Sequence, residues 1–271
     1  PDILLNAPFG LSAAGLGDVL AKSVSSADWR LNHFLFEDYF CQFSIDLLKD
    51  LEPVYLNNPD KIKNRDPDGF KAMFTALFYS SIAMTITGTS SPASGGEHLI
   101  SHTLDMLAVR DGHSHDLHGR QVGVSSILMA ALYERILTID QPRFSPPPEQ
   151  VDETFWGTLT PVVAEEYQKK LPRMIRAIEI LNQPDNWETF RAAIKPHLIP
   201  ARRLKECLRL AGAAHRYSDL RFNNAPVAQD FYLSVVNHAG QMRSRFTILD
   251  IAVLLGVIPE ETEALTVKCC T

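Results

Sequence analysis

The chain has 271 residues, of which 45% are hydrophobic and 21% charged, and its formal net charge at pH 7 is −6. This composition is typical of a globular protein and excludes a disordered or collagen-like chain. The length is enough for one large domain or two small ones. The negative charge argues against a general nucleic-acid-binding protein, which would carry a strongly basic face.

The sequence shows no targeting or membrane-spanning segment. No apolar run approaches the roughly 20 residues that a span needs, and the longest near the end, Ile251–Ile258, contains Gly256. The chain does not begin with a basic segment followed by an apolar stretch, so no signal peptide is predicted. Its four cysteines form no Cys-x-x-Cys pair, which is typical of reduced thiols. We therefore expect a cytoplasmic protein without a membrane span.

Helical periodicity recurs along the chain, and no convincing series of alternating strand segments interrupts it. Between Trp29 and Leu51 apolar residues recur at intervals of mostly three and four, which predicts one helix. A helix is also predicted to begin after Thr247, where Asp250 completes a capping box, and to be the last of the chain, ending at Gly256. Further helices are predicted over 70–86, 122–137, 156–181, 187–194, 201–210 and 227–242.

These patterns predict an all-α, multihelical domain over residues 9–271, within which the proline-rich stretch Ser145–Pro148 is a surface loop. Strand signals are limited to Asp2–Leu5. We therefore expect residues 1–8 to be a short extended leader, the remnant of a preceding α/β domain.

Histidines are concentrated in one short part of the chain. Ser94-Gly95-Gly96-Glu97 has the form of a capping box, which predicts a helix that begins at Ser94. Free N–H groups at such a helix start favour an anion, so Ser94, Gly95 and Glu97 are candidate substrate-binding residues. His98 and His102 would lie four residues apart on one face of this helix. Five of the nine histidines fall in this region, namely His98, His102, His113, His115 and His118.

A metal site would explain this concentration. His118 begins a second predicted helix, so histidines from two helix starts can converge on one ion. Catalytic divalent metals usually take three protein ligands and keep one open position. Asp18 is the candidate third ligand, because Gly15 and Gly17 allow close backbone approach, although alone it would be an ordinary acid at a helix start. His113 and His115 fall in the connecting loop and are expected to be exposed.

Five blocks of sequence, in this order, carry a resemblance to a known family. They are Gly15-Leu-Gly-Asp18-Val-Leu-Ala-Lys, Ala27-Asp28-Trp29, Ser91-Pro-Ala-Ser-Gly-Gly-Glu-His98-Leu-Ile-Ser-His102, Leu117-His118-Gly-Arg-Gln-Val-Gly and Met242-Arg-Ser-Arg-Phe-Thr-Ile-Leu-Asp250. Together they resemble the sn-glycerol-1-phosphate dehydrogenases, particularly the bacterial, arabinose-operon-linked type. That family belongs to the iron-containing alcohol dehydrogenase and dehydroquinate synthase-like superfamily.

The resemblance implies a metal held by Asp18, His98 and His118, with His102 as a catalytic residue that lines the substrate pocket. It also implies a helical C-terminal domain and NAD or NADP bound mainly by a preceding α/β domain. The sequence contains no glycine-rich dinucleotide motif, so we expect the N-terminal nucleotide domain to be missing and the cofactor-binding residues are unknown. Alone, the chain is expected to be inactive.

One departure from the family concerns the substrate. The family commonly has Ser-Arg-Pro where this chain has Ser90-Ser91-Pro92, which removes a guanidinium that would favour a phosphate. The arginines that could compensate are Arg120, Arg221, Arg243 and Arg245.

The leading functional hypothesis is a metal-dependent, NAD(P)-linked oxidoreductase that acts on glycerol 1-phosphate, dihydroxyacetone phosphate or a similar small polyol. Two imidazoles and a carboxylate suit zinc, nickel or iron, and the protein is expected to be a homo-oligomer. One alternative is a helical metal-dependent phosphohydrolase, because His115-Asp116 is an adjacent His-Asp pair. The other is a non-catalytic helical interaction module that retains a metal site.

Overall fold

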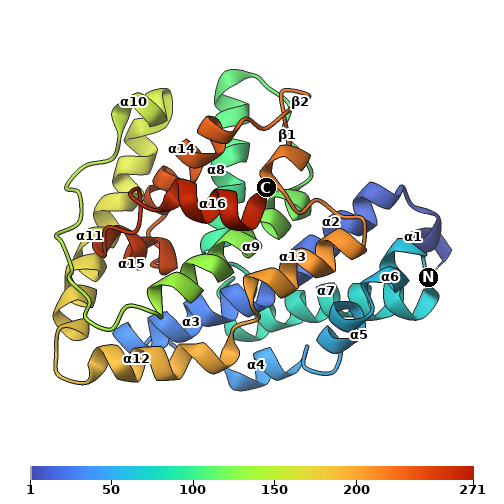
Figure 1. The fold of residues 1–271 in the computed structure, drawn as a ribbon, viewed down its shortest axis with the longest axis horizontal. Helices are drawn as coiled ribbons and strands as arrows, with labels where there is room; N and C mark the ends of the chain where they lie inside the picture. The colour runs from blue at the N-terminus through green and yellow to red at the C-terminus, as the bar shows by residue number, and fades with distance from the viewer. Residues whose placement is uncertain (1) are drawn as a thin grey trace.

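Helix α9 runs through the middle of the fold, and most of its side chains are buried, as is typical of a core helix. The computed structural model describes residues 2–271. Figure 1 shows α9 with helices from both halves of the chain around it. These central elements are α9 (His118–Ile136), α2 (Phe9–Leu20), α8 (Gly96–Asp111), α13 (Ala201–Leu210) and α16 (Thr262–Cys270).

The remaining elements are mostly helices, so the prediction of an all-α, multihelical protein is confirmed. Among the described residues the only sheet is a two-stranded antiparallel ribbon, β1 (Arg221–Phe222) and β2 (Ala225–Pro226). The other α-helices are α1 (Asp2–Asn6), α3 (Lys22–Phe36), α4 (Gln42–Asp46), α5 (Glu52–Asn57), α6 (Pro59–Lys63), α7 (Pro67–Thr87), α10 (Glu153–Trp156), α11 (Thr160–Leu181), α12 (Asn186–Ile194), α14 (Gln229–Ala239) and α15 (Ile248–Leu254). Short 3₁₀ turns cover Gly157–Leu159, Lys195–His197, Tyr217–Asp219 and Gly240–Met242.

Helices α2 and α9 meet backbone to backbone at glycines. A Cβ on Gly17 would lie 2.0 Å from the carbonyl oxygen of Gly119, and a Cβ on Gly119 would lie 2.0 Å from that of Ala14. Real side chains do not make such contacts, so only glycine fits at either position. The predicted close approach is therefore confirmed at Gly17. Gly15 instead faces side chains, because its Cβ would lie 3.3 Å from Leu77 Cδ1.

The start of α8 differs from the prediction. The helix begins at Gly96 with Gly95 as its N-cap, and Ser94 makes no capping hydrogen bond. Two carboxylates take over that role: the Gly95 N–H donates to Glu97 Oε1 (2.8 Å), and the Gly96 N–H donates to Asp28 Oδ2 (2.7 Å). The capping box predicted at Ser94 is therefore wrong, because Asp28 from a distant segment supplies the cap.

Two further predictions of local structure are wrong. The single helix expected between Trp29 and Leu51 ends at Phe36, where Glu37 adopts a left-handed conformation (φ 57°) and turns the chain away before α4. The extended conformation expected for residues 1–8 is wrong over α1, where Leu4 and Leu5 pack against the core beside α7. That run is too short for its apolar pattern to distinguish a helix from a strand. The division of the chain at residue 8 stays a prediction.

The C-terminal region agrees in part with the expectation. The capping box of Thr247 and Asp250 is present, and α15 follows it as predicted. It is not the last helix, since α16 follows after a short turn and packs against α9. Residues 145–148 lie outside any helix, as expected for the proline-rich loop.

Helix α7 bears on the predicted absence of a membrane span. By length and composition it is apolar enough to cross a bilayer, and 39% of its most apolar window is buried inside the fold. Core helices of globular proteins have the same length and apolar composition. The absence of a membrane span stays a prediction.

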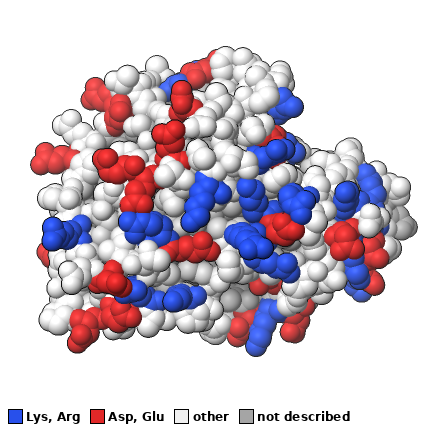
Figure 2. Space-filling view, in the orientation of Figure 1, with Lys and Arg blue, Asp and Glu red and all other residues white. Residues whose placement is uncertain are grey.

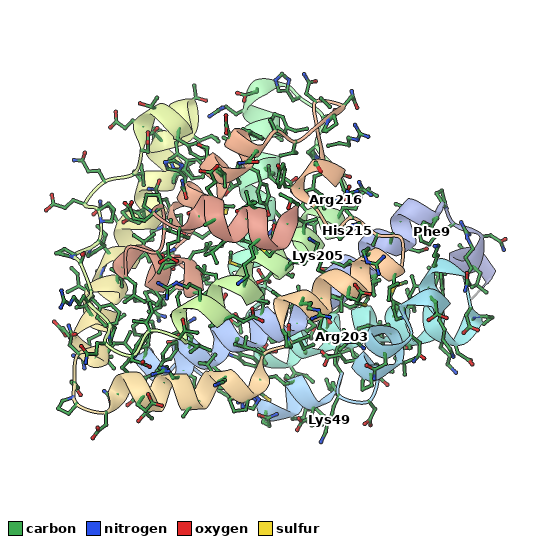
Figure 3. The ribbon with its side chains drawn as sticks, in the orientation of Figure 1. Phe9, Lys49, Arg203, Lys205, His215 and Arg216 are labelled. Carbon is green, nitrogen blue, oxygen red and sulfur yellow. The ribbon has the colours of Figure 1, made fainter. Side chains whose placement is uncertain are left out.

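Charges of both signs are interspersed on the face shown in Figure 2, and positive side chains extend across its middle. Arg203 and Lys205 of α13 are among the cations that Figure 3 labels. Arg203 Nη2 donates to the carbonyl of Leu56 (3.0 Å), and Lys205 Nζ donates to the carbonyl of Thr271 (2.8 Å). These two cations therefore connect α13 to other segments of the fold. That the protein has no nucleic-acid partner stays a prediction.

Candidate metal centre

The fold brings Asp18, His98 and His118 to one place from three helices, α2, α8 and α9. One potential ligand atom of each lies within 4.8 Å of those of the other two. His98 Nε2 is 3.5 Å from Asp18 Oδ1. Three donor atoms around one point, at the junction of three helices, match the ligand number of a catalytic divalent metal site. The ligand roles of these residues stay predictions.

Glu97 orients the imidazole of His98. The carboxylate of Glu97 is fully buried, and its Oε1 accepts hydrogen bonds from His98 Nδ1 (2.7 Å) and from the Gly95 N–H. With its Nδ1–H engaged in this way, the ring presents Nε2 toward Asp18. A carboxylate behind an imidazole is the usual arrangement that fixes a metal-binding histidine. Its burial favours this positioning role for Glu97 over the predicted contact with substrate.

A chain of hydrogen bonds orients the imidazole of His118. The Ser101 hydroxyl donates to Gln121 Oε1 (2.7 Å), so it accepts from His118 Nδ1, which lies 3.0 Å away. Gln121 Nε2 in turn donates to Asp105 Oδ1 (3.1 Å). This order of donors assigns the proton of neutral His118 to Nδ1 and leaves Nε2 as a free ligand atom.

His102 lies beside the three candidate ligands. Its ring centroid is 5.9 Å from that of His98 and 5.3 Å from that of His118, against which it stacks. Burial, together with the positive charges of nearby groups that include His98, lowers the pKa of His102 to about 4. The ring is therefore neutral at physiological pH. His102 also forms a second possible ligand group with Asp105 and His118.

Opposing effects set the protonation of the other groups. Burial would raise the pKa of Asp18, but the hydrogen bond with His98 and the charge of Lys22 outweigh it and lower that pKa to about 2. Burial would lower the pKa of His98, but its hydrogen bonds with Asp18 and Glu97 raise it above the ordinary value. Burial and the charge of His98 lower the pKa of His118. Without a metal, protonated His98 thus directs its Nδ1–H toward Glu97 and its Nε2–H toward Asp18.

The other two histidines of residues 98–118 do not belong to the group of Asp18, His98 and His118. His113 and His115 are exposed in the connecting loop, as predicted. The carboxylate of Asp116 is occupied elsewhere: its Oδ1 accepts from Arg120 Nε (2.8 Å) and its Oδ2 from the Arg221 N–H (2.8 Å). In the described part of the chain His115 and Asp116 belong to no possible metal-binding group, which disfavours the phosphohydrolase alternative.

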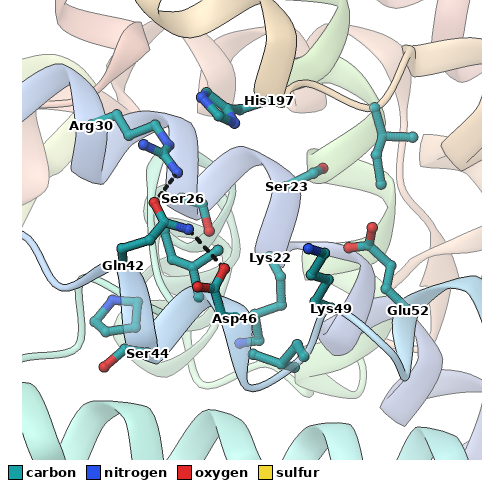
Figure 4. Close-up of a pocket in the computed structure, with 14 residues that line it drawn as sticks. Lys22, Ser23, Ser26, Arg30, Gln42, Ser44, Asp46, Lys49, Glu52 and His197 are labelled. Atoms are coloured by element: carbon teal, nitrogen blue, oxygen red, sulfur yellow. Dashed lines mark hydrogen bonds between the residues drawn. The ribbon is translucent and has the colours of Figure 1, made fainter.

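Lys22 lies between the histidine cluster and a separate cavity. Its charge acts on Asp18 and Glu97, and its Nζ lies 3.5 Å from the carbonyl of Ala93. Figure 4 shows the separate cavity of about 240 Å³, in which Gln42 links Arg30 and Asp46 by hydrogen bonds. None of the predicted site residues lines this cavity.

Comparisons with known proteins identify relatives, although no family model matches the chain. It is 38% identical over 133 residues to the glycerol-1-phosphate dehydrogenase (NAD(P)+) of Halalkalibacterium halodurans, covering 49% of this chain and 33% of that protein. It is 31% identical over 220 residues to the enzyme of the same name from Geobacillus thermodenitrificans, covering 77% of this chain and 52% of that protein. The match to the Pyrococcus horikoshii enzyme is 36% over 132 residues, covering 49% of this chain and 37% of that protein.

The chain is a relative of the glycerol-1-phosphate dehydrogenases. The resemblance inferred from the five sequence blocks is thereby confirmed. The chain spans about half the length, or less, of the curated glycerol-1-phosphate dehydrogenases that it matches.

The sequence analysis assigned no role to Asp28. In the structure of this relative of the glycerol-1-phosphate dehydrogenases, Asp28 connects the helices around the site by hydrogen bonds. Its carboxylate accepts from the N–H groups that begin α8 and α15, at Gly96 (2.7 Å) and Ile248 (2.8 Å), and from the Tyr133 hydroxyl (2.6 Å). Burial and the nearby charge of Glu97 raise the pKa of Asp28 to about 7. Its block, Ala27-Asp28-Trp29, was visible in the sequence, but only the fold shows that one carboxylate caps two helices.

Proposed function

We propose that this chain carries the metal- and substrate-binding part of a metal-dependent, NAD(P)-linked oxidoreductase. The substrate pair we propose is glycerol 1-phosphate and dihydroxyacetone phosphate, or a similar small polyol. The convergence of Asp18, His98 and His118, with each imidazole held by a buried partner, carries the proposal. The names of the relatives support the reaction and the cofactor. We further propose a cytoplasmic homo-oligomer.

The donor set fits zinc, nickel or iron, since all three accept imidazole and carboxylate ligands. When bound, the ion supplies Lewis-acid polarisation of the substrate oxygen. Asp18, His98 and His118 would hold it, while Glu97 and Ser101 fix the two rings. His102, neutral and adjacent, would accept the alcohol proton at a ring nitrogen during oxidation and return it during reduction.

The nicotinamide cofactor requires a further binding element. The 271 residues contain no glycine-rich turn of the kind that seats a pyrophosphate at a helix N-terminus. We propose that an α/β domain outside this sequence binds most of NAD(P) and brings the nicotinamide ring close to His98. The zinc-loaded chain alone should not oxidise glycerol 1-phosphate, and addition of that domain, fused or in trans, should restore turnover.

Metal analysis of single variants tests the proposal. After loading with zinc and gel filtration, the wild-type chain should retain one ion, whereas D18A, H98A and H118A should lose it. H113A is the matched control, because His113 is an exposed histidine of the same cluster, and it should retain the ion. Unchanged zinc content in the three variants would show that the site is elsewhere. An interaction module that kept its metal site would bind zinc but gain no activity with the nucleotide domain.

A further inference from the structure

A polar pocket of about 670 Å³ lies between α3, α11, the segment that joins α7 to α8 and the segment before α15. Its charged lining consists of four cations and two carboxylates, whereas the chain as a whole carries a net charge of −6. The lining of the pocket is therefore net positive, although the chain as a whole is net negative. Its charged residues are Lys169, Arg173, Arg243, Arg245, Asp38 and Glu166.

Two of the four cations are neutralised within the pocket. Arg173 makes a bidentate ion pair with Asp38, in which Nη1 donates to Oδ2 (2.8 Å) and Nη2 to Oδ1 (3.0 Å). Lys169 Nζ donates to Glu166 Oε1 at 2.7 Å. Each of these cations already has a carboxylate partner, so the surplus charge of the pocket belongs to the two remaining arginines.

Those two arginines differ in what they contact. Arg245 is held in place, since it donates to the carbonyl of Ser94 and to Ser90 Oγ (2.6 Å). Arg243 is exposed and has no hydrogen-bond or ion-pair partner anywhere in residues 2–271. Its guanidinium, with up to five donors in a planar fork, is thus free to bind an anion.

Hydroxyl groups line the wall of the pocket that is formed by the segment before α8. Thr89 and Ser91 line it, with their hydroxyl oxygens 3.1 Å apart, and they precede the Ser94–Gly95 turn that begins α8. Because Arg245 donates to the Ser94 carbonyl, this wall is shared with the helix that carries His98.

We propose that Arg243 binds the phosphate group of the substrate in this pocket, with Thr89 and Ser91 as additional hydrogen-bond donors. Arg245 is a positioning residue that fixes the shared wall. The inference rests on the proposed function, because it places the polyol oxygens at Asp18, His98 and His118 and the phosphate at the opposite end. It assigns the preference for a phosphorylated polyol over a free polyol to one side chain.

Phosphate binding to the metal-free chain tests this assignment separately from catalysis. Titrations of wild type, R243Q and R243K with inorganic phosphate, followed by calorimetry in the presence of a chelator, give the affinities directly. R202Q is the matched control, since Arg202 is an equally exposed arginine on the distant helix α13. R243Q should weaken phosphate binding about tenfold or more, R243K should restore part of it, and R202Q should leave it unchanged.

Equal phosphate affinity of R243Q and wild type, or no phosphate binding by wild type, would overturn the assignment. Zinc content, measured in parallel, separates this outcome from failure of the proposed function. If R243Q loses phosphate but keeps its zinc, both proposals stand. If wild type binds zinc but not phosphate, only the phosphate site is refuted, and if wild type binds no zinc, the proposed function fails whatever the phosphate result.

Discussion

Gly17 of α2 and Gly119 of α9 lie in direct backbone contact, and each is the sequence neighbour of a predicted metal ligand. Asp18 follows Gly17, and His118 precedes Gly119. A Cβ on Gly17 would stand 2.0 Å from the Gly119 carbonyl oxygen, so no other residue allows the helices to come this close. The approach of the carboxylate to the imidazole therefore depends on the absence of two side chains.

Gly17→Ala should separate α2 from α9. We expect the free energy of unfolding to fall by about 1–3 kcal/mol or more, because the clash is with backbone that cannot rotate away. Zinc affinity should fall as well, since Asp18 and His118 would move apart. Chemical denaturation and zinc titration measure the two effects.

Gly10→Ala is the control for this prediction. Gly10 lies in the same helix, and a Cβ there would meet nothing within 4 Å. Its substitution should leave zinc binding unchanged and raise stability by at most about 1 kcal/mol, through helix propensity. If G17A were as stable and as zinc-competent as G10A, the glycine contact would not be what holds the ligands together.

Ser101→Ala should weaken metal binding through His118. The variant removes the acceptor for His118 Nδ1–H, and loss of such an orienting partner typically costs about 10–100-fold in metal affinity. Thr103→Val is the control, because Thr103 is equally buried in α8 but its hydroxyl bonds only to the carbonyl of Leu99. Zinc competition assays should separate the two variants; indistinguishable affinities would remove Ser101 from the site.

Zinc binding should be pH-dependent in a defined direction. Asp18 has a pKa of about 2 and is ionised throughout, whereas hydrogen bonds with Asp18 and Glu97 raise the pKa of His98 despite its burial. The ion must displace the proton from His98 Nε2, so affinity should fall as pH drops below that raised pKa. Calorimetry in buffers of different ionisation enthalpy should show that zinc binding releases a proton at a pH below that raised pKa. Zinc binding without proton release, together with an affinity that does not fall with decreasing pH, would contradict this prediction for His98.

Lys170→Met should be strongly destabilising. Lys170 is fully buried, and its Nζ lies 3.0 Å from Asp250 Oδ1 at the start of α15. Removal of the cation leaves a buried carboxylate without its partner, which costs about 3–5 kcal/mol. The adjacent Lys169 pairs with Glu165 and Glu166 at the surface, so K169M should change stability by less than about 1 kcal/mol. Equal losses in the two variants, measured by denaturant unfolding, would refute the distinction.

Much of the helical framework was predictable from local pattern. The helix over 201–210 was predicted with its observed ends, and the capping box of Thr247 and Asp250 marked the start of α15. The end of the helix at Phe36 was not predictable. It depends on a left-handed conformation at Glu37, a position where glycine or asparagine would have indicated a helix end. The start of α8 was placed too early because its cap comes from Asp28, far away in the sequence.

The candidate site, too, was predictable from the sequence only in part. The concentration of histidines and the resemblance to a family point to Asp18, His98 and His118 from the sequence alone. The roles of Glu97 and Ser101 depend on which ring nitrogen each one faces, and that is a property of the packed helices. The sequence named Arg243 as one of four arginines that could favour a phosphate, and only the fold distinguishes it, because the other unpaired-looking cations of its pocket prove to have partners.

Anomalous diffraction at the zinc edge, from crystals of the zinc-loaded chain, locates the metal and its ligands directly. We expect one ion, with His98 Nε2, His118 Nε2 and a carboxylate oxygen of Asp18 each about 2.0–2.2 Å away. An ion held instead by the neighbouring group of His102, Asp105 and His118, or no ion within this cluster, would contradict this expectation.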